Sequence, residues 1–395
     1  MFTRRTILTT AAGGLVAAPL LAGGMRRIDL GLVDGPGERP LAATFADKRD
    51  MIVQRVRPPL LETPMAVFDD ALLTPNDRFF VRWAGGAMPT SIDPASFRLT
   101  LRGAVKAPVQ LTLAEVAAAG ETVEVTAVNQ CAGNSRGFSA PRVGGAQWGH
   151  GAMGNAVWRG VRLRDLLDRA RIGGDAKRVR FAGLDTPLVD GAPQTIKSLP
   201  IDIARRDDVI VAWGMNGDML PLLNGYPLRL IVPGWFATYW IKMLSDIEVL
   251  TVDADDSYFM AKSYRMPAVP VQPGDKDFPT LPISTMPPRS FITSHADGAV
   301  IARGAPLALR GIAMGGDCGV ARVDVLAGGR SFAATLDPEA GEYGFRRWTA
   351  TLPATSGPIG PRCTNTTGVT QPLAASWNPS GYARHCVETI RLTLA

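Results

Sequence analysis

The sequence has 395 residues, a length that predicts two or three domains. Hydrophobic residues make up 46% and charged residues 20%, which excludes a mainly disordered, collagen-like or coiled-coil chain. Its 42 glycines and 31 prolines disfavour a helical bundle. The formal net charge is +6, and 35 of the 42 basic residues are arginines. No run of five basic residues occurs, so a nucleic-acid partner is not expected.

The first 24 residues have the pattern of an export signal. Arg4 and Arg5 precede an apolar stretch that runs from Ile7 to Gly24, and a basic head before a short apolar core is typical of such signals. The twin arginine predicts the Tat route to the periplasm. The apolar stretch is short and weakly hydrophobic for a membrane-spanning helix, and it contains Pro19. We therefore expect the signal to be cleaved off, with no membrane span in the mature protein. Tat carries folded proteins, often with a cofactor already inserted, so residues that could bind a complex cofactor are of interest in this chain.

Residues 25–75 show little periodicity and predict an extended arm. From Asn76 to about Leu250, strands and short helices alternate irregularly, with strands expected over residues 227–232 and 240–252. No Gly-x-Gly-x-x-Gly follows a strand, so a nicotinamide-binding domain is not expected. One helix is predicted by four apolar residues that share a face: Leu163, Leu166, Leu167 and Ala170.

Residues 265–290 contain seven prolines and predict a linker. Apolar and polar residues then alternate in short runs, as around Leu307 and Leu309, Val323 and Val325, and over 389–394. Such runs, separated by glycine and proline turns, predict an antiparallel sandwich of the immunoglobulin type. The expected fold class is therefore α+β, with a signal over 1–24, a mixed domain over 25–280 and a sandwich over 281–395.

The chain has four cysteines, Cys131, Cys318, Cys363 and Cys386. Without a Cys-x-x-Cys or Cys-x-x-Cys-His motif, neither a c-type haem attachment site nor a paired-cysteine zinc site is expected. Cys318, Cys363 and Cys386 could form one disulfide with one cysteine left over, or none, and the sequence does not decide between these cases. A histidine-bound metal would need His150, His295 and His385 to converge, and we expect each to be structural.

Cys131 ends a β-rich run over residues 123–131 and precedes Gly133 and Arg136. A cysteine at the end of a strand, in a glycine-containing loop, is placed to face a cavity. The neighbouring arginine favours the thiolate form. A buried structural cysteine is the alternative, and spacing alone does not decide between them.

Residues 129–136, Asn-Gln-Cys-Ala-Gly-Asn-Ser-Arg, resemble the molybdenum-cysteine loop of the sulfite oxidase family. Residues 148–167 resemble the segment that follows it. The resemblance runs from about Asn76 to the C-terminus, includes residues 76–82, 225–234 and 377–382, and is closest to the catalytic subunits of bacterial periplasmic sulfite dehydrogenases. It implies a molybdopterin-binding domain over 25–280 and an immunoglobulin-like dimerisation domain over 281–395.

The resemblance also implies site residues. Cys131 is the protein ligand of molybdenum in a cofactor with one pyranopterin, a role that suits a soft thiolate. The remaining cofactor-binding positions are Asn224, Arg229 and Lys242. The substrate positions are Arg82, Arg136, Trp148, Tyr264 and, from the second domain, Arg384. Taken singly, each also fits a structural role.

The implied activity is oxidation of sulfite to sulfate by oxygen-atom transfer, with electrons leaving one at a time. Because the chain has no haem motif, the resemblance points to a c-type cytochrome as acceptor. It also points to a homodimer or a complex with a cytochrome subunit.

The sequence departs from the family at two positions. Ala84 and Asn224 stand where many relatives have histidines, and His150 is one possible replacement donor. A molybdenum-dependent sulfoxide reductase of the same fold is the alternative activity, but such chains generally lack the second domain and need less positive charge. A secreted binding module with an inactive site is a further alternative, disfavoured because Cys131, Arg82 and Tyr264 are all present.

Overall fold

The computed structural model describes residues 26–83 and 86–395. The predicted export signal and Ala84 therefore lie outside the described residues. Within the described part of the chain, no helix is long and apolar enough to cross a membrane. The helices are short: α1 (Ala66–Asp70), α2 (Leu113–Ala117), α3 (Leu163–Arg169), α4 (Ile201–Ala204) and α5 (Tyr258–Ala261), with 3-10 turns η1 (Asn76–Arg78), η2 (Arg136–Phe138), η3 (Leu222–Asn224) and η4 (Ala237–Tyr239).

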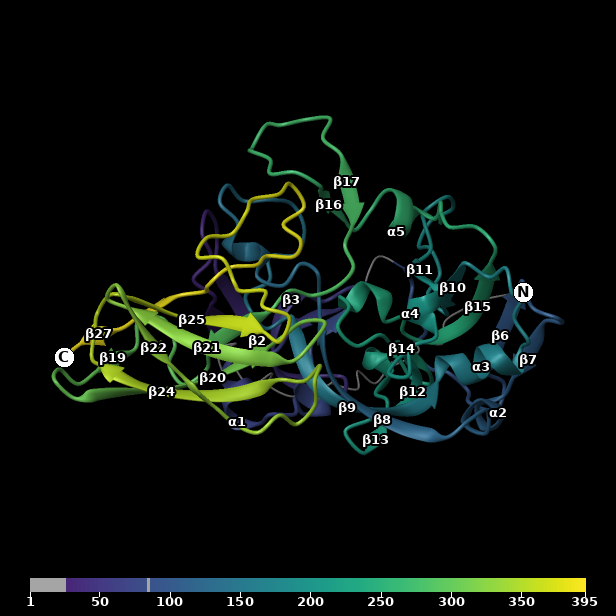
Figure 1. Cartoon of the computed structure of the whole chain (residues 1–395), viewed down its shortest axis with the longest axis horizontal. Coiled ribbons are helices and arrows are strands. Elements are labelled where there is room, and N and C mark those ends of the chain that lie inside the picture. The colour runs from purple at the N-terminus through teal and green to yellow at the C-terminus, as the bar shows by residue number, and fades with distance from the viewer. Residues whose placement is uncertain (1–25, 84–85) are drawn as a thin grey trace, which may run out of the picture.

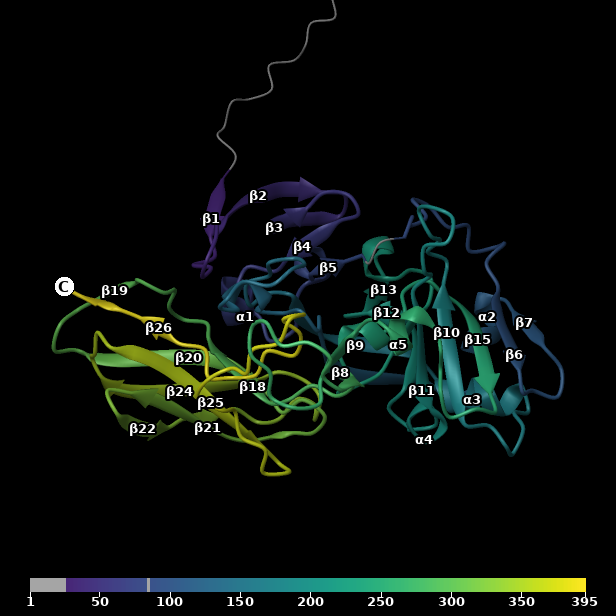
Figure 2. The ribbon, with the colours of Figure 1, turned by 90° about the horizontal axis from the view of Figure 1, so that it is seen from above.

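The N-terminal segment forms an antiparallel sheet, so the predicted extended arm was wrong. Its strands follow in chain order: β1 (Arg27–Asp29), β2 (Glu38–Phe45), β3 (Lys48–Arg55), β4 (Leu60–Glu62) and β5 (Val81–Arg82). An irregularity between Val53 and Arg55 breaks the alternation of side chains, which explains the missing periodicity. Figure 2 shows this sheet in purple over the region where the two lobes of the molecule meet.

Two further sheets build the rest of the first domain. One has the order β11-β10-β15-β6-β7, from β11 (Ile196–Pro200), β10 (Arg178–Gly183), β15 (Leu244–Leu250), β6 (Leu99–Gly103) and β7 (Val109–Leu111). The other has the order β13-β12-β9-β8 with β14 beside β12, from β13 (Asp218–Met219), β12 (Ile210–Met215), β9 (Met153–Arg162), β8 (Thr122–Gln130) and β14 (Arg229–Ile231). Their pairing is antiparallel except for β6 with β15.

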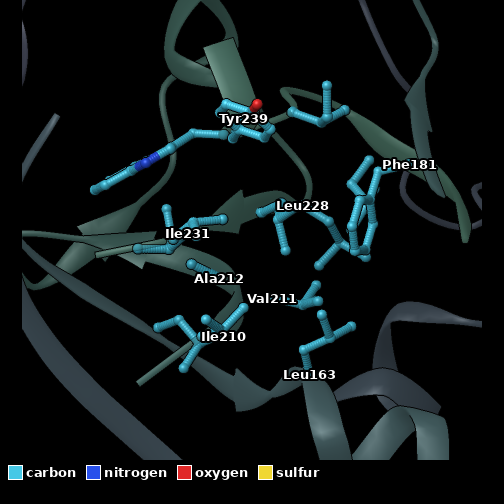
Figure 3. Packing of buried hydrophobic residues seen from close by; sticks show 14 of the residues in the cluster. Leu163, Phe181, Ile210, Val211, Ala212, Leu228, Ile231 and Tyr239 are labelled. Carbon is cyan, nitrogen blue, oxygen red and sulfur yellow. The ribbon is translucent and has the colours of Figure 1, made fainter. Parts of the chain in front are cut away.

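The main core lies between these sheets. The predicted face of α3 is buried, since Leu163, Leu166 and Leu167 are fully covered. Figure 3 shows Leu163 beside Val211 and Ile210 of β12, in the same hydrophobic cluster as Phe181 of β10. Burial of this apolar surface stabilises the domain and fixes the strand ends that carry the site.

The second domain is a sandwich, as predicted. Its sheets have the orders β18-β20-β24-β23 and β22-β21-β25-β26, and Trp348 and Val325 lie in the core between them. Leu307 and Leu309 are buried while their neighbours are exposed, which confirms the alternation. The strands are β18 (Arg289–Ile292), β20 (Pro306–Met314), β21 (Val320–Ala327), β22 (Arg330–Ala333), β23 (Thr335–Leu336), β24 (Arg346–Pro353), β25 (Pro358–Asn365) and β26 (Ile390–Arg391), with β19 (Val300–Ile301) paired to β27 (Thr393–Leu394).

The predicted linker contains a hairpin, β16 (Arg265–Pro267) with β17 (Thr280–Pro282), which projects at the top of Figure 1. At its base, the Ile283 amide donates to the Tyr264 carbonyl at 3.0 Å. Tyr264 is thereby held where the two lobes join.

Strand β8 also contacts the second domain. Val128 of β8 packs in one apolar cluster with Phe291 and Met314 of the sandwich, and its amide donates to the Tyr343 carbonyl at 2.8 Å. The strand that leads to Cys131 is therefore supported by both lobes, which lie side by side in Figures 1 and 2.

Candidate active site

Cys131 begins the connection between β8 and β9. The two strands pair up to Gln130 and Met153, and the Cys131 amide extends this ladder by donating to the Ala152 carbonyl at 2.9 Å. The Gly133 amide points at the Cys131 sulfur, at 3.4 Å. These two backbone contacts fix the position of the Cys131 sulfur at the end of the strand.

The residues after Cys131 form a tight loop. The Asn134 side chain accepts from the Ala152 amide at 2.9 Å and donates to Gln130 Oε1 at 3.2 Å. Ser135 has a φ of 67°, an uncommon left-handed conformation for a residue other than glycine. The Ser135 amide donates to the Gly149 carbonyl at 2.7 Å. Both ends of the loop are thus fixed by hydrogen bonds.

Two cavities meet at Cys131, Arg82 and Tyr264. The first has a volume of about 700 Å³, part of it open to solvent, and is also lined by Asn129, Arg229 and Lys242. The second has a volume of about 900 Å³, also partly open to solvent, and is also lined by Arg136, Trp148 and Tyr382. Of the predicted positions, Arg229 and Lys242 line only the first cavity, whereas Arg136 and Trp148 line only the second. Asn224, predicted for the cofactor, lines neither of these two cavities. Cys131 is 5% exposed and lies at the boundary.

Arg229 is the central cation of the first cavity. It is buried and donates to the Asn224 carbonyl at 2.9 Å and to Asn129 Oδ1 at 3.0 Å. Its guanidinium also lies over the Trp158 ring, 5.1 Å from the centroid. Burial lowers the pKa of Arg229 to about 9. The contacts hold the group firmly but do not neutralise its charge.

Two lysines add to the charge around this cavity. Lys242 donates to the Leu223 carbonyl at 2.7 Å and lies 4.8 Å from the Trp83 ring centroid. Burial, together with the positive charges of Arg229 and Lys48, holds the pKa of Lys242 well below its usual value. Lys48 bonds to the Asn224 side chain, and burial lowers the pKa of Lys48 to about 8.

One carboxyl group, that of Asp185, lines the first cavity. Burial raises the pKa of Asp185, which disfavours its negative form. The cations therefore outnumber the nearby anions, and an anionic group in the cavity would relieve their mutual repulsion.

Several buried donors of the cavity have no hydrogen-bond partner among the described residues: Trp83 Nε1, Asn129 Nδ2 and Arg229 Nε. An unpaired buried donor costs about 1–3 kcal/mol, and native proteins pair most such groups. These donors and the excess positive charge fit a polar ring system that carries phosphate. The residues present thus suit a pterin cofactor.

Arg82 and Tyr264 stand between the two cavities. Arg82 ends β5, and its guanidinium carbon is 5.9 Å from the centroid of the Tyr264 ring. Burial lowers the pKa of Arg82, but Tyr264 and Cys131 outweigh it and the net shift is upward. Tyr264 has a φ of 54°, a strained conformation of the kind that clusters at functional sites.

Arg136 and Trp148 lie in the second cavity, as their predicted roles require. Arg136 donates to the Ser380 carbonyl at 2.9 Å and to the Ala146 carbonyl at 3.2 Å, and a Cβ atom at Gly133 would lie 2.6 Å from its guanidinium. The indole Nε1 of buried Trp148 has no partner among the described residues. The cavity therefore offers charge and a free donor.

Arg384 is not brought into this group. Its guanidinium binds both oxygens of Glu388, at 2.9 and 3.1 Å, and donates to the Phe138 carbonyl at 3.0 Å. It lines a different cavity, shared with Phe138. Its predicted contact with substrate stays a prediction that this geometry does not favour.

The geometry does not favour His150 as the replacement donor. It lines neither cavity beside Cys131; its Nδ1 lies 2.7 Å from Ser135 Oγ and its ring stacks on Phe138 at 4.3 Å. Lys48 instead reaches Asn224, one of the two positions where a histidine was expected. His150 thus contacts Ser135 and Phe138 of the loop that follows Cys131.

Sequence reasoning missed three residues. Lys48 and Lys197 are two of only seven lysines in the chain, and both are buried, which is rare for lysine. Lys197 Nζ lies 4.9 Å from the Tyr264 ring centroid and donates to the Phe259 carbonyl at 2.6 Å. Tyr382 ends the motif over 377–382, a signal that could have marked it as a residue of the site.

The thiols of the second domain are free, as is Cys131. Burial raises the pKa of Cys363 to about 12 and that of Cys386 to about 11. The question of one disulfide or none is thus answered as none in this structure.

Comparisons with known proteins point to one family. The family described as "Oxidoreductase molybdopterin binding domain" matches residues 85–259. The chain is 33% identical to the sulfite oxidase of Gallus gallus over 314 residues, covering 75% of this chain and 66% of that protein. It is 31% identical to the Arabidopsis thaliana sulfite oxidase over 285 residues, covering 69% and 72%.

Mitochondrial sulfite oxidase of Mus musculus is 32% identical over 287 residues, which cover 69% of this chain and 50% of that protein. The chain thus spans between half and about three quarters of the length of these relatives. The crystal structure of the sulfane dehydrogenase SoxCD from Paracoccus pantotrophus has the same fold, with a TM-score of 0.71 at 22% identity over 96% of this chain and 92% of that one. By these similarities, the chain belongs to the sulfite oxidase family of molybdopterin oxidoreductases.

Proposed function

We propose that this protein oxidises sulfite to sulfate at the Cys131 site. The observation that carries the proposal is the meeting of two cavities at Cys131, Arg82 and Tyr264. In the net reaction, sulfite gains one oxygen atom derived from water and releases two electrons and two protons. The relatives named as sulfite oxidases support this substrate.

The first cavity holds the cofactor in this proposal. When bound, a molybdenum centre with one pyranopterin supplies oxygen-atom transfer and accepts two electrons. Cys131 provides the thiolate ligand, which suits a metal that prefers soft donors. Arg229 and Lys242 bind the phosphate through charge-assisted hydrogen bonds, while Trp83 and Asn129 donate to the ring system.

The second cavity positions the substrate. Arg82 and Arg136 attract a small oxyanion, and because both are held by the surrounding structure they need little reorganisation when it binds. Tyr264 lines the same cavity as Cys131, and in this proposal its hydroxyl donates a hydrogen bond to the bound oxyanion. Trp148 and Tyr382 form the walls and limit the access of water, which strengthens the attraction.

In this proposal the electrons leave one at a time to another protein. We propose a c-type cytochrome as the acceptor, in a homodimeric enzyme or in a complex with a cytochrome subunit. We also propose a periplasmic location, on the basis of Arg4, Arg5 and the apolar stretch that follows them.

A sulfoxide reductase is the alternative within the family. A neutral sulfoxide does not need the charges of Arg82 and Arg136, and the sandwich domain is generally absent from such chains. A sulfane-sulfur compound is a further candidate substrate, because the structural neighbour is named a sulfane dehydrogenase.

The test is sulfite-dependent reduction of cytochrome c and ferricyanide by purified exported protein, with molybdenum quantified in the same sample. Parallel assays use methionine sulfoxide with reduced viologen, and a persulfide as a sulfane donor. Turnover of sulfite at near one metal per chain supports the proposal. Full metal content with turnover of only another substrate overturns the choice of sulfite.

The matched variants are Cys131→Ser and Cys318→Ser. The first should lose both metal and activity, because it removes the soft ligand. The second changes a buried thiol of the sandwich domain and should retain both. Equal metal content in the two variants would remove Cys131 from the site.

A further inference from the structure

A buried ionic triad lies behind the Cys131 loop. Glu388 accepts from Arg289 Nη2 at 2.7 Å and from Arg384 at 2.9 and 3.1 Å. Arg289 is 1% exposed and Glu388 is 9% exposed. Burial raises the pKa of Glu388, but His150 and the two arginines outweigh it and lower the value to about 2. The carboxylate therefore stays charged.

Both arginines also donate to the loop that carries the cysteine. Arg289 donates to Ser135 Oγ at 2.9 Å and to Gln130 Oε1 at 3.4 Å, on either side of Cys131. Arg384 donates to the Phe138 carbonyl at 3.0 Å. The triad belongs to the second domain, whereas all three acceptors belong to the first.

The same stretch of the second domain also reaches Arg136. The Ser380 carbonyl accepts from its Nε at 2.9 Å, and the Ala383 amide donates to the Ala132 carbonyl at 2.7 Å. Residues 380–388 thus contact the loop both at Ala132, directly after Cys131, and at Phe138. A shift of this stretch would move the sulfur and the substrate arginine together.

Adhesion between the domains does not require such a group. A buried ion pair stabilises a fold no better than well-packed apolar residues of the same size. The apolar cluster of Val128, Phe291 and Met314 already joins the domains. The triad instead adds specificity of position, because each of its hydrogen bonds to the loop fixes the place of one particular loop atom.

We propose that Arg289, Glu388 and Arg384 are positioning residues, through which the second domain sets the geometry of the Cys131 sulfur and of Arg136. This inference rests on the proposed function, because it assigns Cys131 to the metal. The triad acts through Gln130, Ser135 and Phe138.

Two variants test the proposal. Ser135→Ala removes the hydroxyl that receives Arg289, and Arg384→Met removes the bond to Phe138 while it leaves the Arg289–Glu388 pair intact. The control is Arg310→Ala, which breaks an exposed ion pair between the sandwich and Asp69 of α1 without touching the loop. Each protein is compared with the wild type in metal content, melting temperature, kcat and KM.

The decisive readout is the position of the thiolate-to-molybdenum charge-transfer absorption. We expect it to shift in both test variants at unchanged metal content, with kcat lowered about tenfold, since small misplacements of reacting groups cost that much or more. The control should keep the wild-type absorption and kcat. If the test variants lose only melting temperature, as the control does, the triad is merely structural and the proposal is overturned.

A second readout does not depend on turnover. In metal-free protein, iodoacetamide alkylates Cys131 at a rate set by its position, measured by mass spectrometry of the Cys131 peptide. We expect this rate to change in both test variants and not in Arg310→Ala. Wild-type protein that binds molybdenum but fails to oxidise sulfite would refute the proposed substrate, and the absorption and alkylation results would still decide the role of the triad.

Discussion

Tyr264 of the first domain stacks on Tyr382 of the second, with ring centroids 5.3 Å apart and planes inclined by 16°. Each ring also has an arginine over it: Arg82 lies 5.9 Å from the Tyr264 centroid and Arg136 lies 5.0 Å from that of Tyr382. All four side chains line the same cavity beside Cys131. The substrate cavity is therefore built across the domain junction, and the second domain contributes to it directly.

Replacement of Tyr382 by leucine tests this stack. An aromatic pair contributes about 0.5–1.5 kcal/mol beyond the area it buries. The stack helps to hold Tyr264 in its strained backbone conformation, and the substitution would remove that stabilisation. We expect kcat/KM for sulfite to fall about two- to tenfold, measured by steady-state kinetics. Tyr343→Leu is the control, because Tyr343 bonds to Arg206 at 2.9 Å, away from the cavity. Equal effects of the two substitutions would contradict the special role of the stack.

Arg82→Gln tests the attraction of an oxyanion. A hydrogen bond to a charged group is worth about 1.5–3 kcal/mol, so kcat/KM should fall about ten- to hundredfold, mainly through a higher KM. The salt dependence of kcat/KM should also become shallower, because salt screens charge attraction. Arg102→Gln, which alters a surface arginine paired with Asp246, should change neither. An unchanged KM in Arg82→Gln would show that the arginine does not bind substrate.

Lys242→Met should have opposite effects on loaded and metal-free protein. Without an anion in the cavity, burial and the neighbouring Arg229 and Lys48 disfavour the charged lysine, so the substitution should raise the free energy of unfolding of metal-free protein. With the cofactor, the loss of a phosphate partner should reduce molybdenum content. Urea titration of metal-free protein measures the expected rise in the free energy of unfolding, and metal analysis measures the expected fall in molybdenum content. A destabilised metal-free variant would mean that the charge is already compensated within the protein.

The sequence predicted those parts of the protein that have a local pattern. Helix α3 was found because Leu163, Leu166 and Leu167 share one face, and Cys131 because its loop has a specific order of residues. The N-terminal sheet was missed because its residues pair without a clear alternation, as at the irregularity between Val53 and Arg55. Arg384 was assigned to the substrate from its place in the chain, but Glu388, four residues on, binds its guanidinium.

The lysines were missed for a different reason. Burial of Lys48 and Lys197 depends on contacts with residues far away in sequence, such as Asn224 and Phe259. No window of sequence contains both partners. Their rarity among the basic residues was the one available signal, and it did not say which of the lysines are inside.

Lys197 should make the stability of the protein depend on pH. Burial and, to a lesser extent, Arg265 lower its pKa to about 7 from 10.5, against the opposing effect of Asp255; the rings of Tyr239 and Tyr264 also face the ammonium group. Between about pH 7 and pH 10 the unfolded chain binds a proton at this lysine that the folded chain does not. The contribution of Lys197 to the free energy of unfolding therefore rises with pH across this range.

Lys197→Met removes that contribution and leaves the other titrating groups in place. The free energy of unfolding of the wild type minus that of the variant should thus increase from about pH 7 to about pH 10, as measured by urea titration at several pH values. Lys106→Met is the control, because it replaces an exposed lysine and so also removes one positive charge from the chain. A flat difference for Lys197→Met would mean that the ammonium group keeps its proton in the fold, stabilised by the two tyrosine rings and the Phe259 carbonyl more strongly than burial opposes it.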